Sequence, residues 1–172
     1  GVIQDIHSIS TICREREVLL LSDATQAAGK IPIDVDRMGI DLLAISAHKF
    51  YGPKGSGALY VRRRNPRVNL SPLLDGGGHE KGLRSGTLNV PGIIGLGKAA
   101  TLAMQEMDID IPRITTLRNH LENSLTKEPE VYVNAVGSFR LSTVSNLSFR
   151  FTEGTVLLAA VTKQLAVSSG SA

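Results

Sequence analysis

Short apolar runs alternate with stretches of helical periodicity along this chain, and this alternation limits its fold more than any other feature. The runs that predict strands are Val18 to Leu21, Asp41 to Ser46, Gly57 to Val61 and Ser142 to Phe151. The stretches that predict helices are residues 4–16, 92–107, 113–126 and Glu153 to Leu165. Strands separated by helices are typical of α/β architecture.

Pro112 lies between the two longest helical stretches. Because proline lacks a backbone N–H and its ring clashes with the preceding turn, we expect the helix to break there. The pattern also changes after about residue 105. We therefore expect two lobes, with residues 1–105 in one and residues 106–172 in the other.

The composition argues against several classes of protein. The net charge is only +3, and the densest basic run, residues 61–67, is interpreted as a solvated loop rather than a nucleic-acid surface. No apolar run approaches the roughly 18 residues of a membrane-spanning helix. The 4 histidines show no metal-binding spacing and no cysteine pair accompanies them, so no metal site is expected.

Cys13 is the single cysteine, which permits no intramolecular disulfide and indicates a reducing compartment. It falls at helical spacing with Ile9 and Ile12, so we interpret it as a packing residue rather than a catalytic one. The chain begins with Gly1 and ends at Ala172 directly after an apolar run. We expect it to be a piece of a longer protein.

Polar side chains follow two of the expected strands. Asp23 and Gln26 come after the first, and Ser46, His48 and Lys49 come at the end of the second. In open α/β sheets, ligands bind at the carboxyl ends of strands. If these strands are neighbours, a carboxylate, an amide, a hydroxyl, an imidazole and an amine meet at one edge.

This set of groups suits pyridoxal phosphate (PLP). A lysine such as Lys49 can bind that cofactor covalently, and a carboxylate such as Asp23 can keep its ring nitrogen protonated. Ser46 and His48 offer phosphate donors, and Gln26 could donate to the phenolic oxygen. Simpler interpretations stay open at this point: Asp23 as a turn cap, Lys49 as an exposed strand-end lysine, and His48 as a half-buried histidine with its own partner.

Two glycine-rich segments lead to different interpretations. The segment GIIGLGKAA, from Gly92, matches G-x-x-x-x-G-K, but Ala99 stands where a nucleotide-binding loop needs Ser or Thr. We interpret it as a chance match inside a helix that starts near Asn89. The segment GGGHEKGLRSGT, residues 76–87, combines backbone freedom with Arg and Thr, so it predicts either an anion-binding loop or a flexible surface loop.

Four segments in this order resemble the cysteine desulfurases, PLP enzymes of the class V aminotransferase superfamily. They are DATQ at 23–26, SAHKFYGPKGSGALYVRR at 46–63, GGGHEKGLRSGT at 76–87 and LAVSSGSA at 165–172. The resemblance covers the whole chain. It implies PLP-dependent transferase fold type I, with residues 1–105 in the mainly parallel large domain and residues 106–172 linking to the start of a small α+β domain.

The resemblance also implies roles for single residues. Lys49 would hold PLP as a Schiff base and move protons during turnover. The further cofactor ligands that it implies are Asp23 at the pyridinium nitrogen, Gln26 at the phenolic oxygen, Ser46 and His48 at the phosphate, and Thr87 at the phosphate of the neighbouring subunit in a homodimer. The chain departs from the family at Ala47, where glycine is usual, and at Pro112.

The activity that the resemblance implies is conversion of L-cysteine to L-alanine, with the sulfur passed on as an enzyme persulfide for iron–sulfur cluster assembly. The nucleophilic cysteine of the family follows S-S-G-S-A, so we expect this chain alone to be inactive. A sulfur-acceptor or scaffold protein is an expected partner, and the expected location is cytoplasmic or an organelle. The alternatives are a selenocysteine lyase, another class V aminotransferase, or a non-catalytic truncated binding module.

Overall fold

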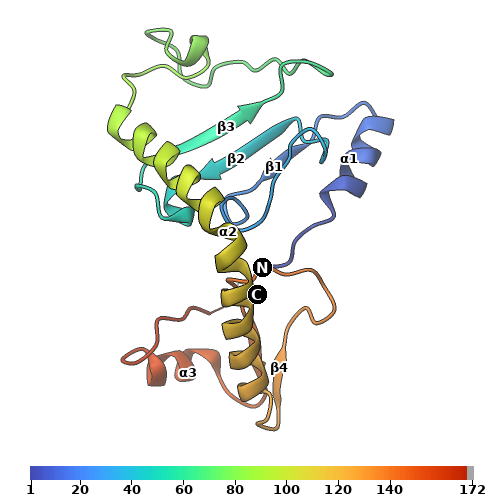
Figure 1. Ribbon diagram of the computed structural model, residues 1–172, viewed down its shortest axis with the longest axis vertical. Coiled ribbons are helices and arrows are strands. Elements are labelled where there is room, and N and C mark those ends of the chain that lie inside the picture. Colours follow the sequence, from blue (N-terminus) through green and yellow to red (C-terminus); the bar gives the residue numbers. More distant parts are fainter. Residues whose placement is uncertain (170–172) are drawn as a thin grey trace. The chain divides into compact units, whose positions relative to one another are not determined.

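Figure 1 shows the computed structural model, which describes residues 1–169. These residues form two compact units: Gln4–Asp108 is one, and Gly1–Ile3 with the residues from Ile109 onward is the other. Among residues 1–169, no helix combines the length and the apolar character needed to cross a membrane. The assignment of residues 1–105 to a cofactor-binding domain stays a prediction.

The Gln4–Asp108 unit contains a three-stranded sheet in the order β1 (Leu21–Asp23), β2 (Leu42–Ser46) and β3 (Gly57–Val61) (Figure 1). β2 pairs with β1 in parallel and with β3 in antiparallel orientation. The last two strands lie where the apolar runs predicted them. The sheet therefore has the mixed α/β setting that the sequence pattern indicated.

The position of β1 corrects the sequence-based expectation. The strand begins at Leu21 rather than Val18, because pairing starts where the Leu20 carbonyl accepts the backbone N–H of Leu42 at 3.0 Å. The Leu21 residue is 61% exposed, so the predicted burial of this run is also wrong.

α1 (Ile6–Glu15) confirms the helix predicted at the start of the chain. It begins after Asp5, whose carboxylate accepts the backbone N–H of Ser8 at 3.0 Å. This N-cap satisfies one of the free donors of the first turn. Cys13 lies on this helix and is half-buried.

Two small clusters form the apolar core of this unit. Ala24, Ile40 and Leu43 make the first, and Ala28, Phe50 and Ala99 make the second. The second cluster joins the turn after β1, the segment after β2, and α2 (Val90–Leu125). The site described below therefore stands on packed residues of three different segments.

α2 is one continuous helix of 36 residues, so the break predicted at Pro112 is wrong. Proline in a helix interior costs about 3 kcal/mol through one lost hydrogen bond and a steric clash. The other hydrogen bonds of so long a helix offset that cost. The helix begins where we expected, since the Asn89 side chain accepts the backbone N–H of Gly92 at 3.2 Å. The G-x-x-x-x-G-K match is helical, as predicted.

The unit that contains Ile109 onward has a two-stranded antiparallel sheet of β4 (Val131–Val133) and β5 (Leu147–Phe149), followed by α3 (Gly154–Val161). The strand predicted from Ser142 to Phe151 is thus much shorter, because only three residue pairs are in register. β4 was missed by the sequence pattern, since three residues give too little periodicity to detect.

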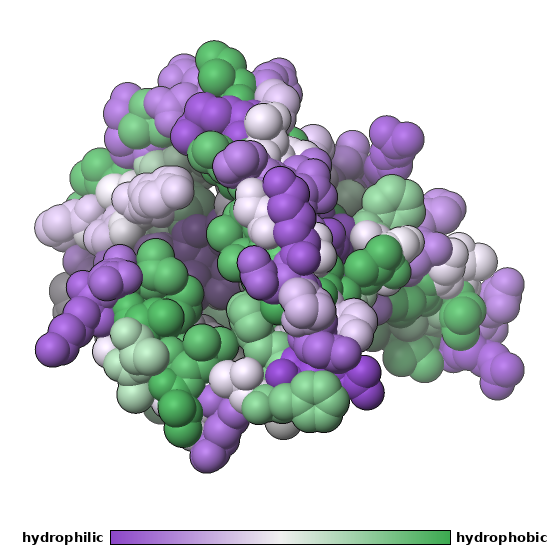
Figure 2. Space-filling view, turned by 90° about the horizontal axis from the view of Figure 1, so that it is seen from below, coloured by the Kyte–Doolittle hydropathy of each residue, from purple (hydrophilic) through white to green (hydrophobic). Residues whose placement is uncertain are grey.

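The surface carries large apolar side chains among the hydrophilic ones, as the face in Figure 2 shows. Ile12 and Ile94 in one unit, and Val136, Phe139 and Phe151 in the other, are more than half exposed.

Candidate functional site

β1 and β2 lie side by side and end at the same edge of the sheet, as the sequence predicted. Asp23, the last residue of β1, pairs with Ala44 of β2, and the Ala24 backbone N–H donates to the Ala44 carbonyl at 2.9 Å. β2 runs two residues further, to Ser46. Parallel pairing therefore brings the polar residues after both strands to one edge.

Lys49 lies in η1 (Ala47–Phe50), a single 3₁₀ turn that directly follows β2. Ala47 is 0% exposed and Phe50 is 3% exposed, so the turn is anchored at its first and last residues. Residues three apart share one side of a 3₁₀ helix. The middle residues are accordingly the more accessible ones: His48 is exposed and Lys49 is half-buried.

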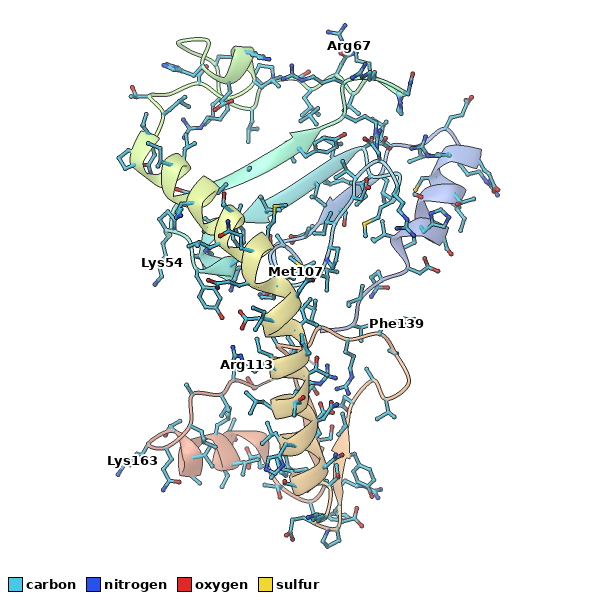
Figure 3. All side chains as sticks on the ribbon, in the orientation of Figure 1. Lys54, Arg67, Met107, Arg113, Phe139 and Lys163 are labelled. Carbon is cyan, nitrogen blue, oxygen red and sulfur yellow. The ribbon has the colours of Figure 1, made fainter. Side chains whose placement is uncertain are left out.

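The glycine after η1 is required by the close approach of the chain to itself. A Cβ at Gly52 would lie 2.8 Å from the Ala47 Cβ and 3.0 Å from the Ala47 carbonyl oxygen. Tyr51, with a φ of 67°, turns the chain out of η1 in the left-handed region. Lys54 follows in the exposed loop, where its side chain points away from the sheet (Figure 3). Of Lys49 and Lys54, only Lys49 is half-buried.

Ser46 and His48 contact each other. The Ser46 Oγ lies 2.9 Å from the His48 Nδ1, although neither side chain is buried. This hydrogen bond orients the imidazole relative to the end of β2 and leaves Nε2 for another partner. The two groups predicted as phosphate ligands thus form one unit.

Asp23 is exposed, and its Oδ1 accepts the backbone N–H of Thr25 at 2.8 Å. The hydrogen bonds from Thr25, first the side-chain bond and then the backbone bond, lower the pKa of Asp23 below 3.8. The carboxylate is therefore ionised near neutral pH. The turn-cap interpretation is confirmed, and it does not exclude a role in cofactor binding, because the carboxylate is exposed.

Gln26 and Lys30 form a pair that the sequence reasoning missed. The Lys30 Nζ donates to the Gln26 Oε1 at 3.0 Å. Burial first, and then the charge of Lys49, lower the pKa of Lys30 from 10.5. Lys30 therefore lies close enough to Lys49 for the two charges to interact. The only signal in the sequence was the spacing of four residues between Gln26 and Lys30.

Thr87 is exposed and lies in the loop that contains η2 (Glu80–Gly82). The segment ends at α2 beside the loop after η1: a Cβ at Gly92 would meet the Ser56 Oγ, and the Ser56 carbonyl accepts the backbone N–H of Ala47 at 2.9 Å. The role of Thr87 at a phosphate stays a prediction. The loop is well exposed over residues 76–87, with only His79, Gly82 and Ser85 half-buried.

The donor set at this edge fits PLP. An amine, a carboxylate with a lowered pKa, a hydroxyl–imidazole pair and an oriented amide are the groups that hold the aldehyde, ring nitrogen, phosphate and phenolic oxygen of that cofactor. Among the described residues, no cluster of His, Cys, Asp or Glu could hold a metal ion.

The sequence profile of the aminotransferase class V family matches residues 1–172, and the chain belongs to that family. Within it, the chain is 52% identical over 172 residues to the cysteine desulfurase IscS of Histophilus somni (strain 2336). It is 54% identical over 173 residues to the cysteine desulfurase IscS of Anaeromyxobacter sp. (strain K). The whole chain is matched in both cases, but it spans only 42% of the length of each relative.

Solved structures give the same result. A NifS-like protein of Rickettsia africae superposes with a TM-score of 0.94 at 34% identity, over 99% of this chain and 47% of that one. The cysteine desulfurase CsdA of Escherichia coli superposes with a TM-score of 0.80 at 26% identity, over 95% of this chain and 44% of that one. These similarities confirm the resemblance to the cysteine desulfurases and the fold type I architecture. Gly170 to Ala172, which end the last resembling segment, lie outside the described residues.

Proposed function

We propose that the full-length protein is a PLP-dependent cysteine desulfurase, which converts L-cysteine to L-alanine and keeps the sulfur as a persulfide on an enzyme cysteine. The observation that carries this proposal is the parallel pairing of β1 and β2. This pairing brings together an amine, a carboxylate and side chains that can donate hydrogen bonds to a phosphate. The identity of more than half of the residues to IscS desulfurases supports it.

Lys49 is proposed to bind the cofactor and to carry the α-proton of the substrate. Bound PLP supplies an electron sink for the carbanion that loss of this proton creates. Asp23 has the low pKa that keeping a proton on the ring nitrogen requires. The persulfide would form on a cysteine outside these 172 residues, because the single cysteine of this chain, Cys13, lies on α1 and not at the β1–β2 edge.

Four more residues complete the proposed site. Ser46 and His48 are proposed to bind the phosphate as a pair, and Gln26 to donate to the phenolic oxygen. Thr87 is proposed to bind the phosphate of a neighbouring subunit. This proposal includes a homodimer.

The setting follows from the chemistry. The enzyme cysteine must be a free thiol to accept the sulfur, so we propose a reducing, cytoplasmic or organellar location and delivery of the sulfur to iron–sulfur cluster assembly. An acceptor or scaffold protein would receive it.

The test uses the full-length protein loaded with PLP. Reduction with borohydride followed by peptide mass spectrometry is expected to find the cofactor on Lys49 and not on the exposed Lys54. The loaded protein is expected to release alanine from L-cysteine, and Lys49→Ala to release none. Labelling at another lysine, or full alanine production by Lys49→Ala, would overturn the proposal. Alanine from L-selenocysteine but not from L-cysteine would indicate a selenocysteine lyase instead.

A further inference from the structure

We propose that Lys30 is a positioning residue of the cofactor site, which acts by holding the Gln26 amide in one orientation. This inference rests on the proposed function, because it concerns the partner that Gln26 would have in a PLP site. It assigns a task to a lysine that the sequence reasoning passed over.

The contact between the two side chains decides the orientation of the amide. The Lys30 Nζ lies 3.0 Å from the Gln26 Oε1. A lysine ammonium can only donate hydrogen bonds, whereas an amide has one end that donates and one that accepts. The end facing Lys30 must therefore be the oxygen, and the donating Nε2 is left for another partner. A flipped amide would present its oxygen to the phenolic oxygen of PLP, where two acceptors repel each other.

Packing holds Lys30 close to Lys49. Gly29 has a φ of 72°, and a Cβ added there would lie 2.7 Å from the Phe50 Cβ. Ala28 and Phe50 belong to the same buried cluster. The residue before Lys30 and the residue after Lys49 are thus in direct contact, and this contact sets the distance between the two lysines.

The position of Lys30 carries a cost in free energy. The residue is half-buried, and Lys49 is the charged group that acts on it. Two lysines held near each other lose free energy through repulsion and desolvation. A surface lysine without a task would avoid this cost by extending into solvent, as Lys54 does in Figure 3.

The experiment measures the pH midpoint of the visible absorption of bound cofactor in the full-length holoenzyme. A hydrogen bond to the phenolic oxygen favours its charged form and lowers this midpoint. Lys30→Met is expected to raise the midpoint by about one pH unit, the effect of one hydrogen bond. Lys30→Arg keeps an obligatory donor and is expected to restore the wild-type midpoint. A midpoint unchanged by Lys30→Met would overturn the inference.

The same measurement in a Gln26→Ala background separates positioning from the effect of charge alone. If Lys30 acts through Gln26, Lys30→Met produces no further shift there. An equal shift in both backgrounds would overturn the inference. Lys30→Gln, whose amide can present either end, is the second variant if Lys30→Met does not fold, and it too is expected to raise the midpoint. A wild-type midpoint in Lys30→Gln would contradict the inference.

Borohydride labelling separates the two proposals. If PLP is found on Lys49 but the pH midpoint does not change in the Lys30 variants, only the proposed role of Lys30 is contradicted. Absence of PLP from Lys49 in the wild type removes the proposed function and this inference with it.

Discussion

Ser46 and His48 are joined by a hydrogen bond of 2.9 Å between Oγ and Nδ1 at the end of β2. The serine belongs to the strand and the histidine to the 3₁₀ turn that follows it. The orientation of the imidazole is thus set by the strand rather than by the ligand. Orientation before binding lowers the entropy that a ligand must overcome.

Ser46→Ala in the full-length protein is expected to weaken PLP retention by about tenfold or more, because it removes one proposed phosphate donor and frees the imidazole. Folding stability is expected to change by no more than about 0.5 kcal/mol, since neither side chain is buried. Dialysis against cysteine-free buffer, with the absorption of bound cofactor as the readout, measures retention. Ser46→Thr keeps the hydroxyl and is expected to retain PLP; equal retention by Ser46→Ala would contradict the prediction.

Arg62, the residue that follows β3, is a buried arginine. The Arg62 side chain is 8% exposed and donates to the Val35 carbonyl at 2.8 Å and to the Ile40 carbonyl at 2.9 Å. Its Nε lies 3.2 Å from the Oδ1 of buried Asp41, a charge contact without hydrogen-bond alignment, because Nε donates to Ile40 instead. Its Nη1 also donates to Asp36 at 2.7 Å.

Arg62→Ala is therefore expected to lower the free energy of unfolding by about 3–5 kcal/mol, because it leaves the buried Asp41 carboxylate without a charged partner, with only the Leu20 backbone N–H donating to it at 2.9 Å. Urea denaturation followed by far-UV circular dichroism measures this loss. Arg63→Ala, one residue away and exposed, is expected to change stability by no more than about 0.5 kcal/mol. Adding Asp41→Asn to Arg62→Ala removes the unpaired charge and is expected to recover part of the lost free energy of unfolding. No recovery in this double variant would show that the buried charge is not the cause of the loss.

The polar residues at the two strand ends could be predicted from the sequence. Each apolar run that predicts a strand leads directly into polar residues, among them Asp23 and Lys49. The position of Lys30 near the Lys49 charge could not be predicted, since it depends on the close approach of Gly29 to Phe50, which no local pattern encodes. The continuity of α2 through Pro112 was missed for a similar reason. A propensity rule reports the cost of proline but not the hydrogen bonds of the helix on either side.

Glu122 and Arg140 form a two-pronged ion pair with contacts of 2.8 Å and 3.0 Å, and the Ser145 Oγ donates to the same carboxylate at 2.9 Å. The hydrogen bond from Arg140 is the main cause that lowers the pKa of Glu122 below 4.5. A carboxyl whose pKa is lower in the folded state stabilises the fold above its unfolded pKa. That contribution is lost as the pH falls through the folded value.

The free energy of unfolding of the wild type, minus that of Glu122→Gln, is therefore expected to be constant near neutral pH and to shrink below about pH 4.5. Denaturation series at several pH values give this difference directly. Glu128→Gln removes an exposed carboxylate and is expected to follow the wild type throughout. A difference that stays constant down to about pH 3 would show that the ion pair does not drive the acid sensitivity.

Gly29 and Gly55 offer a matched test of the packing that sets the distance between Lys30 and Lys49. Both have a left-handed φ, 72° and 78°, so alanine strains the backbone equally at the two sites, by about 1–2 kcal/mol. A Cβ at Gly55 would meet nothing within 4 Å, whereas one at Gly29 would lie 2.7 Å from the Phe50 Cβ. Gly29→Ala is thus expected to cost about 1–3 kcal/mol more than Gly55→Ala in urea denaturation.

The same pair of variants connects packing to the site. Because Phe50 follows Lys49 directly, pushing Phe50 away is expected to displace η1 and to loosen bound PLP in full-length Gly29→Ala, while Gly55→Ala keeps the cofactor. Absorption of retained PLP after gel filtration compares the two. Equal stability and equal retention would mean that the turn after β1 yields to the added methyl group, and that the distance between the two lysines is not set by this contact.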